Sequence, residues 1–76
     1  MNFIKEIKQA QEFQKKGNFD KAISIYKNII FQDKENFEAN NGLAITFILN
    51  KNINQSINIL SNMIELYPKR YEPFVN

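Results

Sequence analysis

Apolar residues in the first part of the chain recur every three or four positions, which is the spacing of an amphipathic helix. The first stripe of this kind consists of Phe3, Ile7, Ala10 and Phe13. Gly17 follows two lysines, a combination typical of a helix C-terminus, where glycine accepts a left-handed conformation and cations favour the helix dipole. We therefore expect a first helix that ends near Lys16.

A second apolar stripe follows after a turn of about three residues. It consists of Ile23, Tyr26, Ile29 and Ile30. Asp20 is the expected N-cap of this helix, because its carboxylate can accept hydrogen bonds from the unpaired N–H groups of the first turn. The helix is expected to end near Phe31. The short turn predicts an antiparallel helical hairpin.

The second half of the chain carries the same signals. Asn36 is the expected N-cap of a third helix that continues to Leu49. Asn54 is the expected N-cap of a fourth helix, which continues to about Leu66 and ends at Tyr67-Pro68 because proline cannot continue a helix. The sequence therefore predicts an all-α fold of tandem antiparallel helix-turn-helix hairpins.

The turn between the third and fourth helices lacks the glycine of the first turn. Lys51 stands at the position that corresponds to Gly17. A non-glycine residue at positive φ is strained, and asparagine tolerates this region better than lysine. The left-handed position is therefore expected at Lys51, or else at Asn50 or Asn52.

The chain matches itself when it is shifted by about 34 residues, the length of one helix-turn-helix repeat. Ala10 then falls on Ala44, and Ala22 falls on Ser56. The small residues Ala22 and Ser56 are expected at close helix crossings. The residues expected to form the core are Phe13, Phe19, Tyr26, Ile30, Leu43, Phe47, Leu60 and Ile64.

The run from Gly17 to Tyr26 reads Gly-Asn-Phe-Asp-Lys-Ala-Ile-Ser-Ile-Tyr, and a more degenerate version returns in the second half. This run resembles the tetratricopeptide repeat, and the resemblance covers roughly residues 3–70. It implies a single domain over residues 1–76, with repeat one at about 3–36, repeat two at about 37–70 and a partial third helix at 71–76. Since about three repeats are the usual minimum for stability, the chain is expected to be a fragment of a longer array or to complete its core with a partner.

The resemblance implies a protein–protein interaction module that binds a peptide or helix of a partner in a concave groove formed by the first helix of each repeat. Carried onto this sequence, the partner-binding residues are Ile7, Gln11, Lys15, Asn41, Ile45, Ile48 and Leu49, with Gln14 and Glu38 beside them. For the three apolar residues of the second repeat, burial against a neighbouring helix or subunit is the alternative. The carboxylate clamp of the chaperone-docking subclass is absent, since its positions hold Ile7, Gln11, Gly42, Glu72 and Asn76.

Composition excludes several kinds of chemistry. The 76 residues include no cysteine and no histidine, so disulfides, the usual zinc sites and histidine-activated nucleophiles are ruled out. We expect no enzyme activity, no catalytic residue, no cofactor and no metal. The net charge of +2 is too small for the basic stripe of a nucleic-acid-binding protein, so no nucleic-acid partner is expected.

No apolar stretch approaches the ~20 residues needed to span a bilayer, and the N-terminus lacks the apolar segment of a secretory signal. We expect no membrane partner and a cytoplasmic location. One alternative function remains beside peptide binding: a self-associating structural module, a homo-oligomer that uses Phe74, Val75 and the apolar face of the second repeat. A nucleic-acid-associated helical repeat is a distant further alternative.

Overall fold

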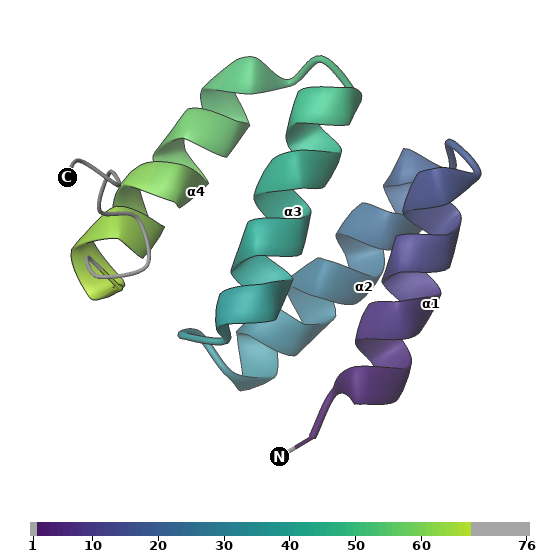
Figure 1. Cartoon of the computed structure of the whole chain (residues 1–76), viewed down its shortest axis with the longest axis horizontal. Coiled ribbons are helices and arrows are strands. Elements are labelled where there is room, and N and C mark those ends of the chain that lie inside the picture. The colour runs from purple at the N-terminus through teal and green to yellow at the C-terminus, as the bar shows by residue number, and fades with distance from the viewer. Residues whose placement is uncertain (1, 68–76) are drawn as a thin grey trace, which may run out of the picture.

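The computed structural model describes residues 2–67, which form four helices and no strand (Figure 1). The helices are α1 (Ile4–Lys15), α2 (Phe19–Gln32), α3 (Phe37–Leu49) and α4 (Ile53–Leu66). Each helix packs against the next one in the chain, and α1 also contacts α3. The expected all-α fold of consecutive antiparallel hairpins is confirmed. The partial third repeat expected at 71–76 lies outside the described residues.

The starts of α2 and α4 differ from the expectation. Asn18 and Asn52 occupy the N-cap positions, so Asp20 and Asn54 lie inside the first helical turn and their prediction as N-caps was wrong. Neither observed N-cap residue makes a side-chain capping bond. The preceding turn fixes these positions through the backbone, because the N–H of Asn18 donates to the carbonyl of Phe13 at 2.8 Å and that of Asn52 to Phe47 at 2.7 Å.

The start of α3 agrees with the sequence. The Asn36 side-chain oxygen accepts a hydrogen bond from the N–H of Ala39 at 2.9 Å, which is the capping interaction expected of asparagine. Its amide nitrogen donates to the Asp33 carboxylate at 3.2 Å. The side chain of Asn40 donates to the carbonyl of Asn36 at 2.8 Å. These bonds order the loop between the two repeats.

The two hairpin turns have the same backbone conformation. Gly17 has φ of 79° and Lys51 has φ of 65°. In each turn this residue donates its N–H to the carbonyl three positions earlier, Gln14 at 3.1 Å and Ile48 at 3.0 Å respectively. This is the helix C-terminal motif in which a left-handed residue satisfies the last free carbonyls. Lys51 itself therefore takes the left-handed position, and the alternative at Asn50 or Asn52 was wrong.

The core contains many small side chains at the helix crossings. Ala10, Ala22, Ala39 and Ala44 have no exposed surface, and Ser56 has almost none, which agrees with the expectation for Ala22 and Ser56. Large side chains fill the space between these crossings. The large buried side chains are Phe3, Ile7, Tyr26, Ile29, Leu43, Phe47 and Met63.

The expected core residues are not all buried. Tyr26, Leu43 and Phe47 are buried. Phe13, Phe19, Ile30 and Leu60 are half-buried. Ile64 is 50% exposed, so its prediction as a core residue was wrong. The physical reason is that α4 contacts only α3 among the described helices, and nothing in the described chain covers the far side of α4.

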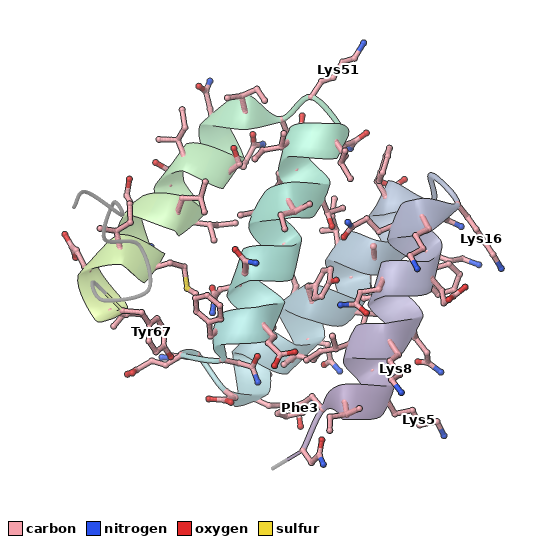
Figure 2. All side chains as sticks on the ribbon, in the orientation of Figure 1. Phe3, Lys5, Lys8, Lys16, Lys51 and Tyr67 are labelled. Atoms are coloured by element: carbon pink, nitrogen blue, oxygen red, sulfur yellow. The ribbon has the colours of Figure 1, made fainter. Side chains whose placement is uncertain are left out.

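The end of α4 is attached to the loop between the two repeats. The Tyr67 hydroxyl donates a hydrogen bond to the backbone carbonyl of Glu35. The ring of Tyr67 meets the ring of Phe37 edge-on, with the centroids 5.4 Å apart. Figure 2 shows Tyr67 at this end of the molecule. Lys16 and Lys51 project away from the helices there, and Lys5 and Lys8, which are also labelled, are exposed as well.

Candidate functional site

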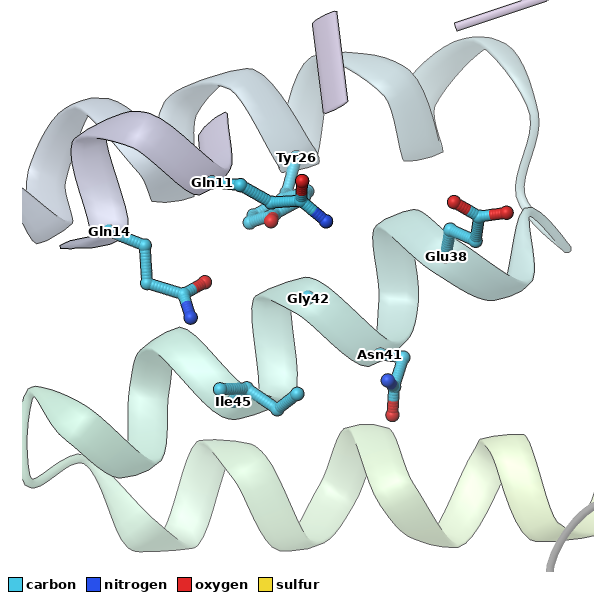
Figure 3. Close-up of a pocket in the computed structure, with 7 residues that line it drawn as sticks. All are labelled: Gln11, Gln14, Tyr26, Glu38, Asn41, Gly42 and Ile45. Carbon is cyan, nitrogen blue, oxygen red and sulfur yellow. The ribbon is translucent and has the colours of Figure 1, made fainter. Parts of the chain in front are cut away.

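A groove of about 270 Å³ lies between α1 and α3, with α2 behind it (Figure 3). We call it the α1–α3 groove. Its walls come from residues at helical spacing on α1 and α3, because side chains three or four positions apart share one face of a helix. The lining residues are Gln11, Gln14, Tyr26, Glu38, Asn41, Gly42 and Ile45.

Tyr26 reaches this groove from α2 because Gly42 leaves room for its ring. A Cβ atom at residue 42 would lie 2.4 Å from Tyr26 Cζ and 2.7 Å from the hydroxyl oxygen. The side chain of Tyr26 is only 1% exposed. Its hydroxyl therefore sits at the bottom of the groove, beside the bare Cα of Gly42.

The Tyr26 hydroxyl makes no hydrogen bond within the part of the chain that the structure describes. Buried polar groups normally have a partner, because losing hydration without one costs free energy. Burial also raises the pKa of the Tyr26 phenol above its ordinary value, so the hydroxyl is neutral at physiological pH. It is available as both a donor and an acceptor for a ligand.

A buried threonine fixes the amide of Gln14 in the wall of the groove. Thr46 Oγ1 lies 2.7 Å from the Gly42 carbonyl oxygen and 2.9 Å from Gln14 Oε1. The hydroxyl has one proton, so it donates to one of these two oxygens at a time. In this arrangement the side-chain amide nitrogen of Gln14 remains available as a donor to a ligand. Figure 3 shows Gln14 reaching from α1 toward α3.

The chemistry of the groove is mainly that of neutral hydrogen-bonding groups. Gln11, Gln14 and Asn41 contribute side-chain amides, and each amide offers donors and an acceptor. Glu38 is the one charged side chain among the lining residues. Ile45 is 39% exposed and adds an apolar surface.

The groove brings together part of the predicted partner-binding set. Gln11, Asn41 and Ile45 line it, as do the flanking positions Gln14 and Glu38. Ile48 and Leu49 are 43% and 50% exposed and continue the face of α3 beyond the lining residues. Lys15 is exposed and lies outside the lining residues.

Ile7 lies elsewhere than expected, because it is 7% exposed and belongs to the core cluster with Phe3 and Ala10. It leaves almost no surface for a partner. Sequence reasoning placed Tyr26 in the core alone and considered Gly42 only as a position of the absent carboxylate clamp. A glycine inside a helix lowers helix stability by about 1 kcal/mol, so Gly42 is the sequence signal of a close approach.

The structure also bears on two properties considered from the sequence, metal binding and membrane spanning. Residues 2–67 contain no group of three or more acidic, histidine or cysteine side chains that could hold a metal ion. Within the same residues, no helix has the length and apolar character needed to cross a membrane.

The comparison with known protein families agrees with the repeat architecture. The family model described as "Tetratricopeptide repeat" matches residues 13–73. No curated protein and no solved structure matches the chain significantly. The family match covers α2, α3 and α4 and most of the sequence, and proteins of this family generally use their repeats as non-catalytic scaffolds for protein–protein interaction. The chain belongs to the tetratricopeptide repeat family.

Proposed function

We propose that the chain is a protein-interaction module that binds an extended segment of a partner protein in the α1–α3 groove. One observation carries this proposal. The groove ends on a buried hydroxyl, that of Tyr26, which has no hydrogen-bond partner among residues 2–67 and faces a space lined by side-chain amides. A ligand that supplies the missing hydrogen bond gains affinity at this point.

A peptide backbone fits these groups because each peptide unit has one N–H donor and one carbonyl acceptor. The α3 wall runs from Glu38 to Ile45, a length of about 10 Å at 1.5 Å per helical residue. An extended peptide covers this length with about three residues. Gln11 belongs to α1 and Asn41 to α3, and both line the groove, so that a bound strand can be contacted from both helices.

The two ends of the groove favour different ligand side chains. Glu38 supplies a negative charge near the start of α3, which suits a lysine or arginine of the ligand. Ile45 and Ile48 supply apolar surface about two to three turns further along the helix. We therefore infer that a favoured ligand carries a basic residue and, three to five positions away, a large apolar residue.

A binding role is more consistent with this site than catalysis. The groups that line the groove are amides, one carboxylate and a phenol whose raised pKa keeps it protonated at neutral pH. General acid–base chemistry works best with a group whose pKa lies near the operating pH, and the phenol lies far from it. We propose that the chain has no catalytic activity, needs no cofactor and acts on neither nucleic acid nor membrane.

The proposal is tested by selecting peptides from a random 12-residue display library against the intact chain and measuring their dissociation constants. Ile45→Asp and Ile48→Asp should each weaken binding about tenfold or more, since a charge replaces apolar contact surface. Tyr26→Phe should weaken it up to about tenfold, the value of one hydrogen bond. Phe31→Asp is the matched control, because Phe31 is 84% exposed and lies outside the groove.

Circular dichroism of each variant separates binding from folding. Helicity like that of the parent together with undiminished peptide binding by both isoleucine variants would exclude the groove. Unfolding of either isoleucine variant would identify that residue as part of the core and would equally end the proposal.

Self-association is a second candidate function, and it is favoured by a different observation. Ile53, Ile57 and Ile64 leave an apolar surface on α4 that no described helix covers. Phe74 and Val75, which the sequence suggested for such an interface, lie outside the described residues.

A further inference from the structure

One side of α4 carries a straight apolar stripe, formed by Ile53, Ile57, Leu60 and Ile64. The three isoleucines are 48%, 53% and 50% exposed, and Leu60 is half-buried. Among the described helices α4 contacts only α3. In Figure 1, α4 lies at the end of the molecule opposite to α1. The stripe is therefore a surface that no other helix within residues 2–67 covers.

The corresponding stripe one repeat earlier is covered. It consists of Phe19, Ile23, Tyr26 and Ile30 on α2. All four residues are buried or half-buried, and the contact of Tyr26 with Gly42 shows that α3 is the covering helix. The chain itself thus shows that this kind of stripe accepts one further helix, which lies antiparallel to the helix that carries it.

The spacing of the α4 stripe identifies a helix that fits it. Steps of four, three and four residues are the pattern of a coiled-coil seam. This pattern is the same when it is read in either direction along the helix. A second α4 in antiparallel orientation would therefore place Ile53 against Ile64 and Ile57 against Leu60, with the same two contacts repeated by symmetry.

We propose that the α4 stripe is the interface of a homodimer, in which the α4 helices of two copies pack antiparallel about a twofold axis. Such an interface is isologous, because the same surface serves on both subunits, and it closes after two copies. It involves neither α1 nor the α1–α3 groove, so it does not depend on peptide binding, and it rests on self-association, the second candidate function.

The charges of α4 support self-pairing. Glu65 is the one charged residue between Ile53 and Leu66, so two copies of α4 bring little repulsion together. The antiparallel register places each Glu65 beside the first turn of the other α4. A carboxylate is favourable there, because the N-terminus of a helix carries a partial positive charge.

End-to-end stacking of copies is disfavoured by the outer face of α1. In such a stack, α1 of one copy would take the place on α4 that α3 takes on α2. The buried residues of α3 include Ala39, Gly42, Leu43 and Thr46, and Gly42 lies against Tyr26 of α2. Their counterparts on α1 are Lys5, Lys8, Gln9 and Glu12, all of them exposed. Burying these charges without partners would cost several kcal/mol, so a closed dimer is favoured over an open filament.

The dimer should be weak, because four residues per copy bury much less than the ~800 Å² per partner of a standard interface. Sedimentation equilibrium on the intact chain, from about 10 μM to about 1 mM, should show the mass rise from 9.0 kDa toward twice that value. Ile57→Asp should remain monomeric over the whole range with the helicity and Tm of the parent. Ile45→Asp, a change on α3, should dimerise as the parent does.

Two results of this experiment would overturn the proposal. One is a parent chain that stays monomeric at the highest concentration, which would leave the stripe to some other protein. The other is loss of helicity in Ile57→Asp, which would mean that the chain covers the stripe itself.

The orientation of the helices can be tested by cross-linking, because the chain contains no cysteine. In the antiparallel register, two copies of Ile53→Cys hold their sulfurs about 16 Å apart along the helix axis, beyond the reach of a disulfide. A mixture of Ile53→Cys and Ile64→Cys places the two cysteines opposite each other. Mild oxidation should therefore give the mixed dimer at least several times faster than either self-dimer. Equal rates for the three species would contradict the twofold arrangement.

Discussion

The ring of Tyr26 lies against the Cα of Gly42 so closely that a Cβ atom on residue 42 would come within 2.4 Å of Tyr26 Cζ. This contact joins the second helix of one repeat to the first helix of the next. It also explains why a helix interior contains a glycine, which is otherwise unfavourable by about 1 kcal/mol relative to alanine. The same pair of residues therefore connects the two repeats and shapes the bottom of the α1–α3 groove.

Gly42→Ala should destabilise the chain in spite of the higher helix propensity of alanine. The added methyl group meets a ring that is almost fully buried, and overpacking of this kind costs about 1–3 kcal/mol. The gain in helix propensity is about 1 kcal/mol, which leaves a net loss of up to about 2 kcal/mol. Chemical denaturation followed by circular dichroism measures this difference.

The control for Gly42→Ala is the same substitution in a Tyr26→Leu background. Leucine lacks the ring atoms that the methyl group would meet, and Leu60 is the residue found at the corresponding position of the second repeat. In this background Gly42→Ala should become neutral or stabilising by up to about 1 kcal/mol. An equal loss in both backgrounds would show that the Tyr26 ring is not the obstacle.

Because both hairpin turns contain a left-handed residue, introducing glycine in the second turn and removing it from the first should change stability in opposite directions. Lys51 has φ of 65°, a conformation that costs a non-glycine residue about 1–2 kcal/mol. Lys51→Gly should therefore raise the free energy of unfolding by about 1 kcal/mol. Gly17→Ala should lower it by a similar amount through its φ of 79° alone, because no atom lies within 4 Å of the added Cβ. Thermal denaturation of the two variants measures both changes. A Tm that shifts in the same direction in both variants would contradict the matching conformations of the two turns.

The burial of Ala22 predicts that the stability of the chain depends strongly on the size of the side chain at residue 22. Ala22 has no exposed surface, so Ala22→Leu should cost about 1–3 kcal/mol by overpacking between α2 and its neighbours. Ser24→Leu is the matched control, because Ser24 is exposed on the same helix, and its effect should stay within about 0.5 kcal/mol. Similar losses at both positions would mean that the repeat register is wrong.

The helices themselves could be predicted from the sequence because their signals are local and occur twice. Apolar spacing, the glycine at residue 17 and the cap at Asn36 each fix one boundary. The expected N-caps of α2 and α4 were wrong because they rested on the capping preference of the side chain alone. At Asn18 and Asn52 the backbone bonds of the preceding turn determine where the next helix begins.

The candidate site could be predicted only for residues that share one face of a single helix. The face of α3 with Asn41 and Ile45 follows from helical spacing, and both residues line the groove. Ile7 and Ile64 were misplaced because burial depends on which helices cover each face. Repeat matching alone does not give that information at the two ends of an array. The part played by Tyr26 depends on a contact between two repeats, which no single-helix pattern contains.

The buried hydroxyl of Tyr26 also predicts a pH dependence of stability. Burial raises the pKa of this phenol in the folded chain, whereas in the unfolded chain it titrates near its ordinary value of about 10. Between the two pKa values the unfolded state has lost the proton and the folded state still holds it. Because the unfolded state then binds fewer protons, the free energy of unfolding falls as the pH rises. The contribution is complete below about pH 10 and is lost as the pH rises through the folded pKa.

Tyr26→Phe isolates this contribution, because every other ionisable group is identical in the two proteins. At neutral pH the variant should be at least as stable as the parent, since it removes a buried hydroxyl that has no partner within residues 2–67. Above about pH 10 the parent should lose stability more steeply than the variant. Urea denaturation of both proteins at several pH values measures the difference. Parallel curves across the alkaline range would mean that the phenol is hydrated in the folded chain, and the α1–α3 groove would then hold water at its deepest point.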